Sequence, residues 1–114
     1  MNFPLVVRSN YGTWGFDAFS YGLITVVKPS ESHRMGLLAH EATHAKQFIK
    51  YGIVGFLVLY FCSSRWRYKF ELEAYRVQCS FPEESTESAA WSLATKYNIN
   101  HTYEECLASI VGVQ

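Results

Sequence analysis

The sequence predicts an α+β fold, in which a small N-terminal antiparallel sheet is followed by four or five helices. Two observations support this class. Short runs of β-branched and aromatic residues occur before Pro29, separated by turn-forming residues. After Pro29, the chain consists of helix-favouring segments separated by capping and helix-breaking residues. Strand and helix signals are therefore segregated along the chain, which is typical of the α+β class.

Length and composition indicate one folded domain over residues 1–114. A chain of this length, 49% hydrophobic and 17% aromatic, can bury about two-thirds of its unfolded surface. Ten basic and ten acidic residues give a formal net charge of zero, so there is no overall positive field to attract nucleic acid. The chain has no Cys-x-x-Cys pair, and we expect its cysteines to be reduced core residues. They are Cys62, Cys79 and Cys106.

Two or three short antiparallel strands are expected near the N-terminus. Leu5–Val7 is a β-prone run, Trp14–Phe19 is rich in aromatic residues, and Leu23–Val27 is strongly β-branched. Gly22 marks a turn between the second and third runs, and Pro29 ends the last strand.

A long helix is expected from about His33 to Tyr51. Ser30 or Ser32 is the predicted N-cap, because a serine hydroxyl can accept a hydrogen bond from a free amide of the first turn. Gly52 suits the position that ends a helix. Apolar residues occur on most sides of this helix, so we expect it to be largely covered by the rest of the protein.

The most apolar run of the chain, Ile53–Cys62, predicts a second, buried helix. A bilayer crossing needs about 20 apolar residues, so this run is too short to span a membrane. The basic and aromatic run Arg65–Lys69 follows directly, and such residues beside an apolar helix are also found at membrane interfaces. Contact of residues 53–69 with a membrane surface, or an exposed groove for a partner, are the alternatives to burial.

Three more helices are expected in the C-terminal half. Phe70–Cys79 and Glu83–Tyr97 consist largely of residues that favour or tolerate helix. A possible capping box at Thr102 and Glu105 starts the last helix, which runs to about Val111.

The strongest functional signal is the motif His40-Glu41-Ala42-Thr43-His44 in the long helix. Residues four apart lie on one helix face, so the imidazoles of His40 and His44 can share one metal ion. Glu41 projects about 100° away around the helix, where it can act as a general base on a metal-bound water instead of serving as a ligand. The alternatives are a surface helix that carries these residues by coincidence and a pair of hydrogen-bonded core histidines.

A catalytic zinc ion normally takes a third protein ligand. Glu71 and Glu73 are favoured, because they lie in a helix that follows an apolar run long enough for the chain to turn back. They point in different directions, so only one of them can bind the metal directly. The other candidates are Asp17, His33, His101 and the C-terminal acids.

These motifs resemble the gluzincin metallopeptidases, in which the third zinc ligand is a glutamate from a downstream helix. More closely, His-Glu-x-x-His-x-x-Gln over His40–Gln47 and aromatic-Glu-x-Glu-Ala over Phe70–Ala74 are similar to small gluzincin-like peptidases of bacteria and phages. Those proteins have a minimal His-Glu-x-x-His core. The resemblance covers about residues 20–80 and leaves the C-terminal helices unassigned.

The resemblance implies a zincin-like core and a Zn²⁺ ion held by His40, His44 and Glu71. It implies that Glu41 activates the metal-bound water for hydrolysis of a peptide or protein substrate. In gluzincins, the strand before the metal helix is a sheet edge that binds extended substrate. We therefore expect Leu23–Val27 to bind a peptide by strand addition.

The sequence departs from the gluzincin pattern at Tyr75, where one version of the pattern has an aspartate that orients a ligand histidine. Gln47 lies one turn beyond His44 on the ligand face, so it either supports a ligand or faces the substrate. The candidates for stabilising the oxyanion of the reaction are Tyr68, Tyr75 and His101.

The expected function is that of a zinc-dependent metallopeptidase. One alternative is a non-catalytic metal-binding or structural protein, bacterial or phage-associated, that keeps a peptidase-like fold; the intact Glu41 argues against it. Another is a membrane-surface protein built around Ile53–Lys69. Met1–Val7 lacks the basic and apolar regions of a signal peptide, so the expected location is cytoplasmic.

Overall fold

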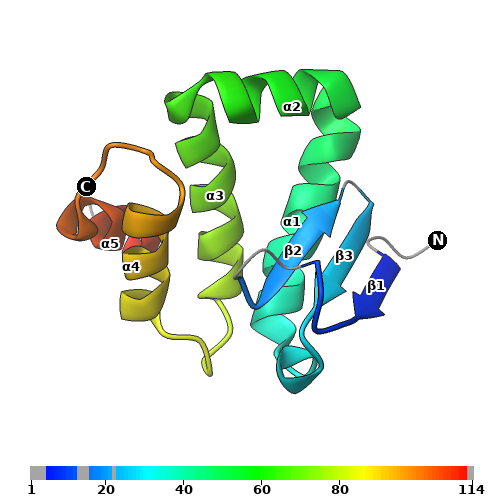
Figure 1. The fold of residues 1–114 in the computed structure, drawn as a ribbon. Coiled ribbons are helices and arrows are strands. Elements are labelled where there is room, and N and C mark those ends of the chain that lie inside the picture. The colour runs from blue at the N-terminus through cyan, green and yellow to red at the C-terminus, as the bar shows by residue number, and fades with distance from the viewer. Residues whose placement is uncertain (1–4, 13–15, 22, 113–114) are drawn as a thin grey trace.

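The α+β architecture is confirmed in the residues that the computed structural model describes, which are 5–12, 16–21 and 23–112. Within these residues, three strands precede five helices (Figure 1). Trp14 and Gly22, for which the sequence predicts a strand and a turn, lie outside the described residues.

The sheet is mixed, so the expectation of a wholly antiparallel sheet was wrong. Its order is β1-β3-β2, and β3 (Ile24–Val27) pairs antiparallel with β2 (Ala18–Tyr21). On its other side β3 pairs parallel with β1 (Leu5–Arg8). The most β-branched strand takes the centre, where Thr25 and Val27 are fully buried. Strand order and direction depend on non-local pairing, which the individual runs do not encode.

Helix α1 (Met35–Tyr51) begins later than expected, and neither predicted serine caps it. A 3₁₀ turn over Pro29–Glu31 precedes it, and the hydroxyl of Ser32 donates to the Pro29 carbonyl within that turn. Arg34 is the N-cap residue and provides no side-chain hydrogen bond. The helix ends at Gly52 as predicted, with a φ of 76° that favours glycine.

Helix α2 (Ile53–Cys62) lies across the ends of α1 and α3 (Figure 1). It was expected to be buried, and that prediction was wrong, since Phe56 is the one buried residue of this fully described helix. Among the described residues, no single helix is long and apolar enough to cross a bilayer. The pair formed by α1 and α2 passes that test together but is bent by 113°.

Helix α3 (Ser64–Gln78) begins at Ser64 rather than near Phe70, so the basic run forms its first turns. The hydroxyl of Ser63 caps it by accepting from the amide of Trp66. The chain then turns into α4 (Thr86–Lys96), which starts three residues later than predicted at Glu83.

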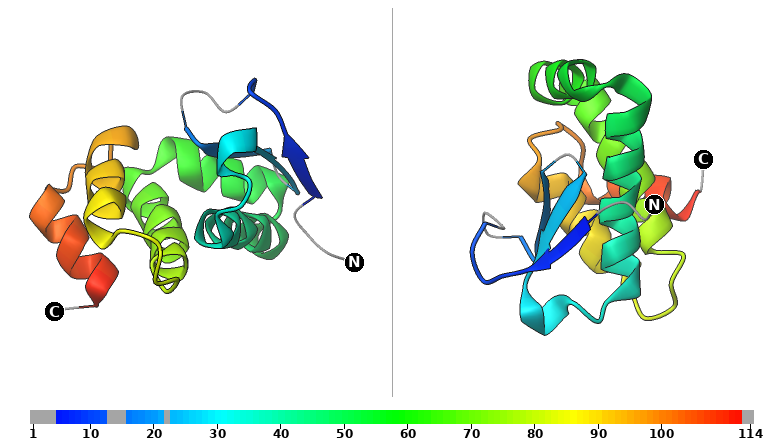
Figure 2. Two further views of the ribbon diagram at one scale, coloured as in Figure 1. Left: turned by 90° about the horizontal axis from the view of Figure 1, so that it is seen from below. Right: turned by 90° about the vertical axis from the view of Figure 1, so that its right-hand side faces the viewer.

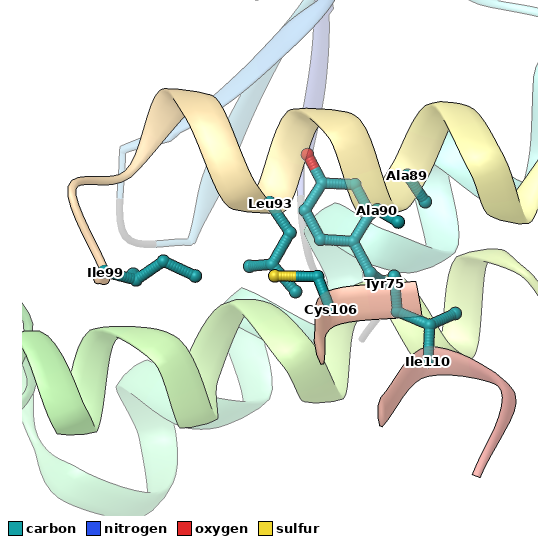
Figure 3. Packing of buried hydrophobic residues seen from close by; sticks show 7 residues of the cluster. All are labelled: Tyr75, Ala89, Ala90, Leu93, Ile99, Cys106 and Ile110. Carbon is teal, nitrogen blue, oxygen red and sulfur yellow. The ribbon is translucent and has the colours of Figure 1, made fainter. Parts of the chain in front are cut away.

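Helix α5 (Tyr103–Val111) starts with the predicted capping box, in which Thr102 and Glu105 each bond to the backbone of the other. The two C-terminal helices pack against α3 around a cluster of buried residues (Figure 3). Its members are Tyr75, Ala89, Ala90, Leu93, Ile99, Cys106 and Ile110. The cysteines are free, as expected, but Cys62 is exposed and Cys79 only half-buried, so the prediction that all three lie in the core was wrong.

Helices α1 and α3 run side by side in opposite directions, and this pair positions the candidate site. The sheet packs on α1 through β2, whereas α4 and α5 pack beside α3 (Figure 2). The facing sides of α1 and α3 are therefore covered from two directions, which explains how polar residues on them become buried.

Candidate metal centre

Helices α1 and α3 bring together His40, His44 and Glu71. One potential ligand atom of each lies within 4.8 Å of the others, and all three residues are buried. The Nε2 atoms of His40 and His44 are 3.3 and 3.1 Å from the same oxygen, Oε1 of Glu71. The spacing of four residues along α1 puts the histidines on one face, and the antiparallel α3 places the carboxylate opposite them.

The buried side chain of Gln47 determines which nitrogen of His44 carries hydrogen. Its Nε2 donates to the carbonyl of Phe70 at 3.0 Å and to the carboxylate of Glu73 at 2.7 Å. Its Oε1 therefore faces Nδ1 of His44, at 2.9 Å, and a carbonyl oxygen can only accept. Nδ1 must be the donor, so a neutral His44 presents the lone pair of Nε2 to Glu71.

The Nε2 lone pair of His44 and the carboxylate oxygen of Glu71 repel each other. A metal ion between the two atoms, or a proton bound to one of them, removes this repulsion. Burial alone would lower the pKa of His44, but the negative charge of Glu71 outweighs it and raises the pKa to about 9. Burial would likewise raise the pKa of Glu71, and the two histidines outweigh it and hold the pKa well below its usual range. The pocket thus favours a carboxylate paired with a positive charge, which either a proton or a metal ion can supply.

The second oxygen of Glu71 is held by Tyr60 of α2. The Tyr60 hydroxyl donates to Oε2 at 2.5 Å. Burial and the charge of Glu71 raise the pKa of Tyr60 well above its ordinary value, so the hydroxyl keeps its proton and remains a donor. This bond leaves Oε1 of Glu71 directed at the histidines.

His40 packs against an aromatic residue, Tyr75, at the position where one version of the gluzincin pattern has an aspartate. The ring of Tyr75 meets that of His40 edge-on, with centroids 4.4 Å apart. The Tyr75 hydroxyl pairs with that of Tyr97 at 2.9 Å. Nδ1 of His40 is buried and has no hydrogen-bond partner among the described residues. Packing therefore sets the orientation of His40, whereas a hydrogen bond sets that of His44.

Glu41 is buried beside the three residues and is held by the sheet. Its Oε2 accepts a hydrogen bond of 2.5 Å from Ser20 of β2. The Ser20 oxygen in turn lies 3.3 Å from the hydroxyl of Thr25, which can donate to it. Glu41 is thus bonded to the sheet and is not one of the three grouped ligands, which agrees with its angular offset on α1.

A groove of about 880 Å³ opens onto this group. Glu41, His40, His44 and Glu71 line it together, and Ser20 forms part of the wall on the β2 side. Most of its remaining surface is apolar. The apolar lining includes Phe16, Phe19, Phe48, Phe56, Leu57 and Phe61. A polar, titratable group at the base of a largely apolar groove is the usual arrangement of a ligand or substrate site.

Strand β3 cannot be the substrate edge that was expected over Leu23–Val27. It is the central strand, paired on both sides, so that prediction was wrong. The strand nearest the groove is β2, which lies at the edge of the described sheet and contributes Ala18, Phe19 and Ser20 to the groove wall.

The remaining ligand candidates lie elsewhere. Glu73 is exposed and accepts a hydrogen bond from Gln47, so it contacts the residue that holds His44 and is not grouped with the ligands. Asp17 pairs with Arg34. His33 is exposed, and the C-terminal acids of α5 lie in its first turn.

The oxyanion candidates are also separated from the groove. The ring of His101 stacks on that of Tyr68 at 4.0 Å, and the Tyr68 hydroxyl donates to Ser109 at 2.8 Å. The Tyr75 hydroxyl is engaged with Tyr97. None of the three is among the residues that line the groove in the described chain.

Two residues of the site, Tyr60 and Ser20, were missed by sequence reasoning. Tyr60 carries a hydroxyl in an otherwise apolar run, which is the one signal that could have singled it out. Ser20 had no signal, because its contact with Glu41 depends on how the sheet docks onto α1.

The chain was compared with known protein families, curated proteins and solved structures. The chain has no significant match to a known protein family, a curated protein or a solved structure.

Proposed function

We propose that the protein is a zinc-dependent metallopeptidase that cleaves peptide bonds in the groove beside α1. The observation that carries this proposal is the buried set of His40, His44 and Glu71, accompanied by Glu41 in the same groove. Oε1 of Glu71 lies within 3.3 Å of both Nε2 atoms, which suits three ligands of one shared ion.

The residues present fit a zinc ion. Two imidazole nitrogens and one carboxylate oxygen form a donor set found in catalytic zinc sites, which keep a further position open for water or substrate. Once His44 is neutral, the lone pair of its Nε2 faces the Glu71 carboxylate, and a divalent cation satisfies both atoms. Glu71, His40 and His44 would hold the ion. It would act as a Lewis acid that polarises the scissile carbonyl and acidifies water.

Glu41 supplies the proton-transfer group. Ser20 holds its Oε2, and we assign its other oxygen, Oε1, to taking a proton from the attacking water and returning it to the leaving nitrogen. The hydrogen bond from Ser20 also fixes the carboxylate with respect to β2. An extended peptide along the outer edge of β2 would pass next to this carboxylate, and strand addition would supply its main-chain hydrogen bonds.

The test combines metal analysis with peptide hydrolysis. We expect about one zinc ion per chain in the wild-type protein and in Glu41→Gln, and loss of zinc in His40→Ala. Hydrolysis of a mixed peptide library should fall by about 10²–10⁴ in Glu41→Gln. A wild-type protein that binds no metal, or a Glu41→Gln variant with undiminished turnover, contradicts the proposal. Stoichiometric zinc without any hydrolysis would instead indicate the non-catalytic metal-binding protein.

A further inference from the structure

Helix α2 exposes an apolar surface that its packing does not account for. Val54 and Val58 are 75% and 53% exposed, and Phe61, which also lines the groove, is 69% exposed. A few exposed apolar residues are normal on any protein, but these three lie on one short helix, and Ile49 near the end of α1 is exposed as well.

Part of the exposed surface of α2, formed by Val54 and Val58, is distinct from the face that lines the groove. Phe56 and Tyr60 are one turn apart and line the groove. Val54 and Val58 are also one turn apart, point in a different direction around the helix, and are not among the groove-lining residues. The side of α2 that carries Val54 and Val58 can therefore contact another surface without blocking the groove.

The charge around this helix is strongly one-sided. Residues 42–70 contain five basic and no acidic residues, so their formal charge is +5, and the rest of the chain has five basic and ten acidic residues, a formal charge of −5. The five basic residues are Lys46, Lys50, Arg65, Arg67 and Lys69. All except Arg67 are exposed.

The positions of these charges match the ends of α2. Lys46 and Lys50 lie in the last turns of α1, whereas Arg65 and Lys69 lie in the first turns of α3. Because α2 crosses the ends of both helices (Figures 1 and 2), the segments that carry these basic residues adjoin it at its two ends. Arg67 is used within the fold, where it donates to the backbone carbonyls of residues 60, 97 and 98.

We propose that α2 and its flanking basic residues form a docking surface for an anionic lipid bilayer, with α2 lying in the plane of the interface. An exposed apolar helix bordered by lysine and arginine is complementary to acyl chains below and anionic headgroups around it. Trp66, over which Lys69 lies at 4.8 Å, adds an amphipathic ring of the kind favoured at this depth. The surface would bind lipid whether or not the metal site is catalytic.

The experiment is co-sedimentation of the full chain with phosphatidylcholine vesicles, with and without phosphatidylserine. We expect binding to the anionic vesicles, weakened by high salt. The double variant Val54→Ser/Val58→Ser should bind at least about tenfold more weakly, because it removes apolar area from the interface. Arg65→Gln/Lys69→Gln should weaken binding to anionic vesicles only.

Matched controls separate these effects from general changes in the protein. Val111→Ser removes an equally exposed valine from α5, and Arg8→Gln removes an exposed charge from β1; both should bind as the wild type does. Circular dichroism verifies that each variant is folded. Absence of binding to anionic vesicles at low salt overturns the proposal, as does binding that Val54→Ser/Val58→Ser leaves unchanged. Self-association without lipid binding, abolished by Val54→Ser/Val58→Ser, would assign the surface to a second copy of the chain and also overturn it.

Discussion

Gln47 accepts a hydrogen bond of 2.9 Å from Nδ1 of His44, and through this bond it sets the tautomer of a candidate metal ligand. The same amide donates to the carbonyl of Phe70, so it also ties α1 to α3 one residue before Glu71. One buried side chain thereby controls both the orientation of one ligand and the approach of another. Partners of this kind typically matter nearly as much as the ligands themselves.

Replacement of Gln47 by Leu should lower the affinity for zinc by about 10–100-fold, because Nδ1 of His44 loses its acceptor and the ring loses its fixed tautomer. Competition with a chromogenic chelator measures this. Gln78→Leu is the matched control, since Gln78 is also a buried glutamine but donates to Glu84 instead of serving the site. It should lose stability with little change in zinc affinity; equal losses of affinity in both variants would refute the role assigned to Gln47.

Tyr60→Phe should also weaken zinc binding, though less than loss of a ligand, because Oε2 of Glu71 loses the hydroxyl that orients the carboxylate. We expect a decrease in affinity of about tenfold, measured by the same competition. Tyr68→Phe serves as the control, since it removes a hydroxyl from α3 that is bonded to Ser109 and not to the site. If Tyr60→Phe binds zinc as tightly as Tyr68→Phe, the hydroxyl has no part in positioning Glu71.

Several local features of this protein were predictable from its sequence, although the N-cap of α1 and the start of α3 were not. The pairing of His40 with His44 follows from helical spacing alone, and the stop at Gly52 and the capping box at Thr102 follow from backbone hydrogen-bonding requirements. Physical reasoning alone left two glutamates, Glu71 and Glu73, as candidates for the third ligand. The resemblance to gluzincins singled out Glu71, and the structure brings that glutamate to the histidines.

Other predictions were wrong because they concern packing between distant segments. The position of β3 at the centre of the sheet required knowledge of which strands pair, and the exposure of α2 required knowledge of what covers it. Hydropathy measures how well a residue tolerates burial, but it does not measure whether the chain supplies a partner surface. The same limit applies to Ser20, which meets Glu41 only because the sheet docks on α1.

The link between Arg34 and Glu84 should make stability fall in acid. Nη2 and Nε of Arg34 donate to the two oxygens of Glu84 at 2.6 and 3.1 Å, and the Glu84 side chain is 4% exposed. The hydrogen bonds from Arg34 lower the pKa of Glu84 below its ordinary value of 4.5. A lowered pKa in the folded state stabilises the fold fully above pH 4.5, and this contribution is lost as the pH falls through the folded-state value.

Glu84→Gln tests this relation. At neutral pH it should lower the free energy of unfolding by about 1–2 kcal/mol, since a charge-assisted pair is replaced by a neutral one. The difference from wild type should narrow as the pH falls below 4.5, where the wild-type carboxylate also becomes protonated. Urea unfolding at a series of pH values measures it. Glu83→Gln, at an exposed neighbouring acid, controls for net charge, and a difference that stays constant with pH would contradict the linkage.

Gly36 and Gly55 should respond in opposite ways to replacement by alanine, although both lie in helices. A Cβ on Gly36 would lie 2.5 Å from Cγ of Glu84 and 2.9 Å from the backbone oxygen of Gln78. The start of α1 would have to move away from the end of α3 to relieve these clashes. We therefore expect the free energy of unfolding to fall by about 1–3 kcal/mol. A Cβ on Gly55 meets nothing closer than Cβ of Tyr51, at 3.9 Å, and higher helix propensity should stabilise this variant by about 0.5–1 kcal/mol.

Chemical denaturation of the two variants provides the comparison, and a double variant identifies the source of the loss. Part of the clash in Gly36→Ala is with Glu84, whose bonds to Arg34 would be disturbed. Gly36→Ala and Glu84→Gln should therefore be less than additive, because both weaken the same contact between α1 and the segment after α3. Full additivity would show that the loss of stability in Gly36→Ala comes from the contact with the Gln78 backbone alone. A Gly36→Ala variant as stable as the wild type would show that the neighbouring atoms move aside without loss of stability.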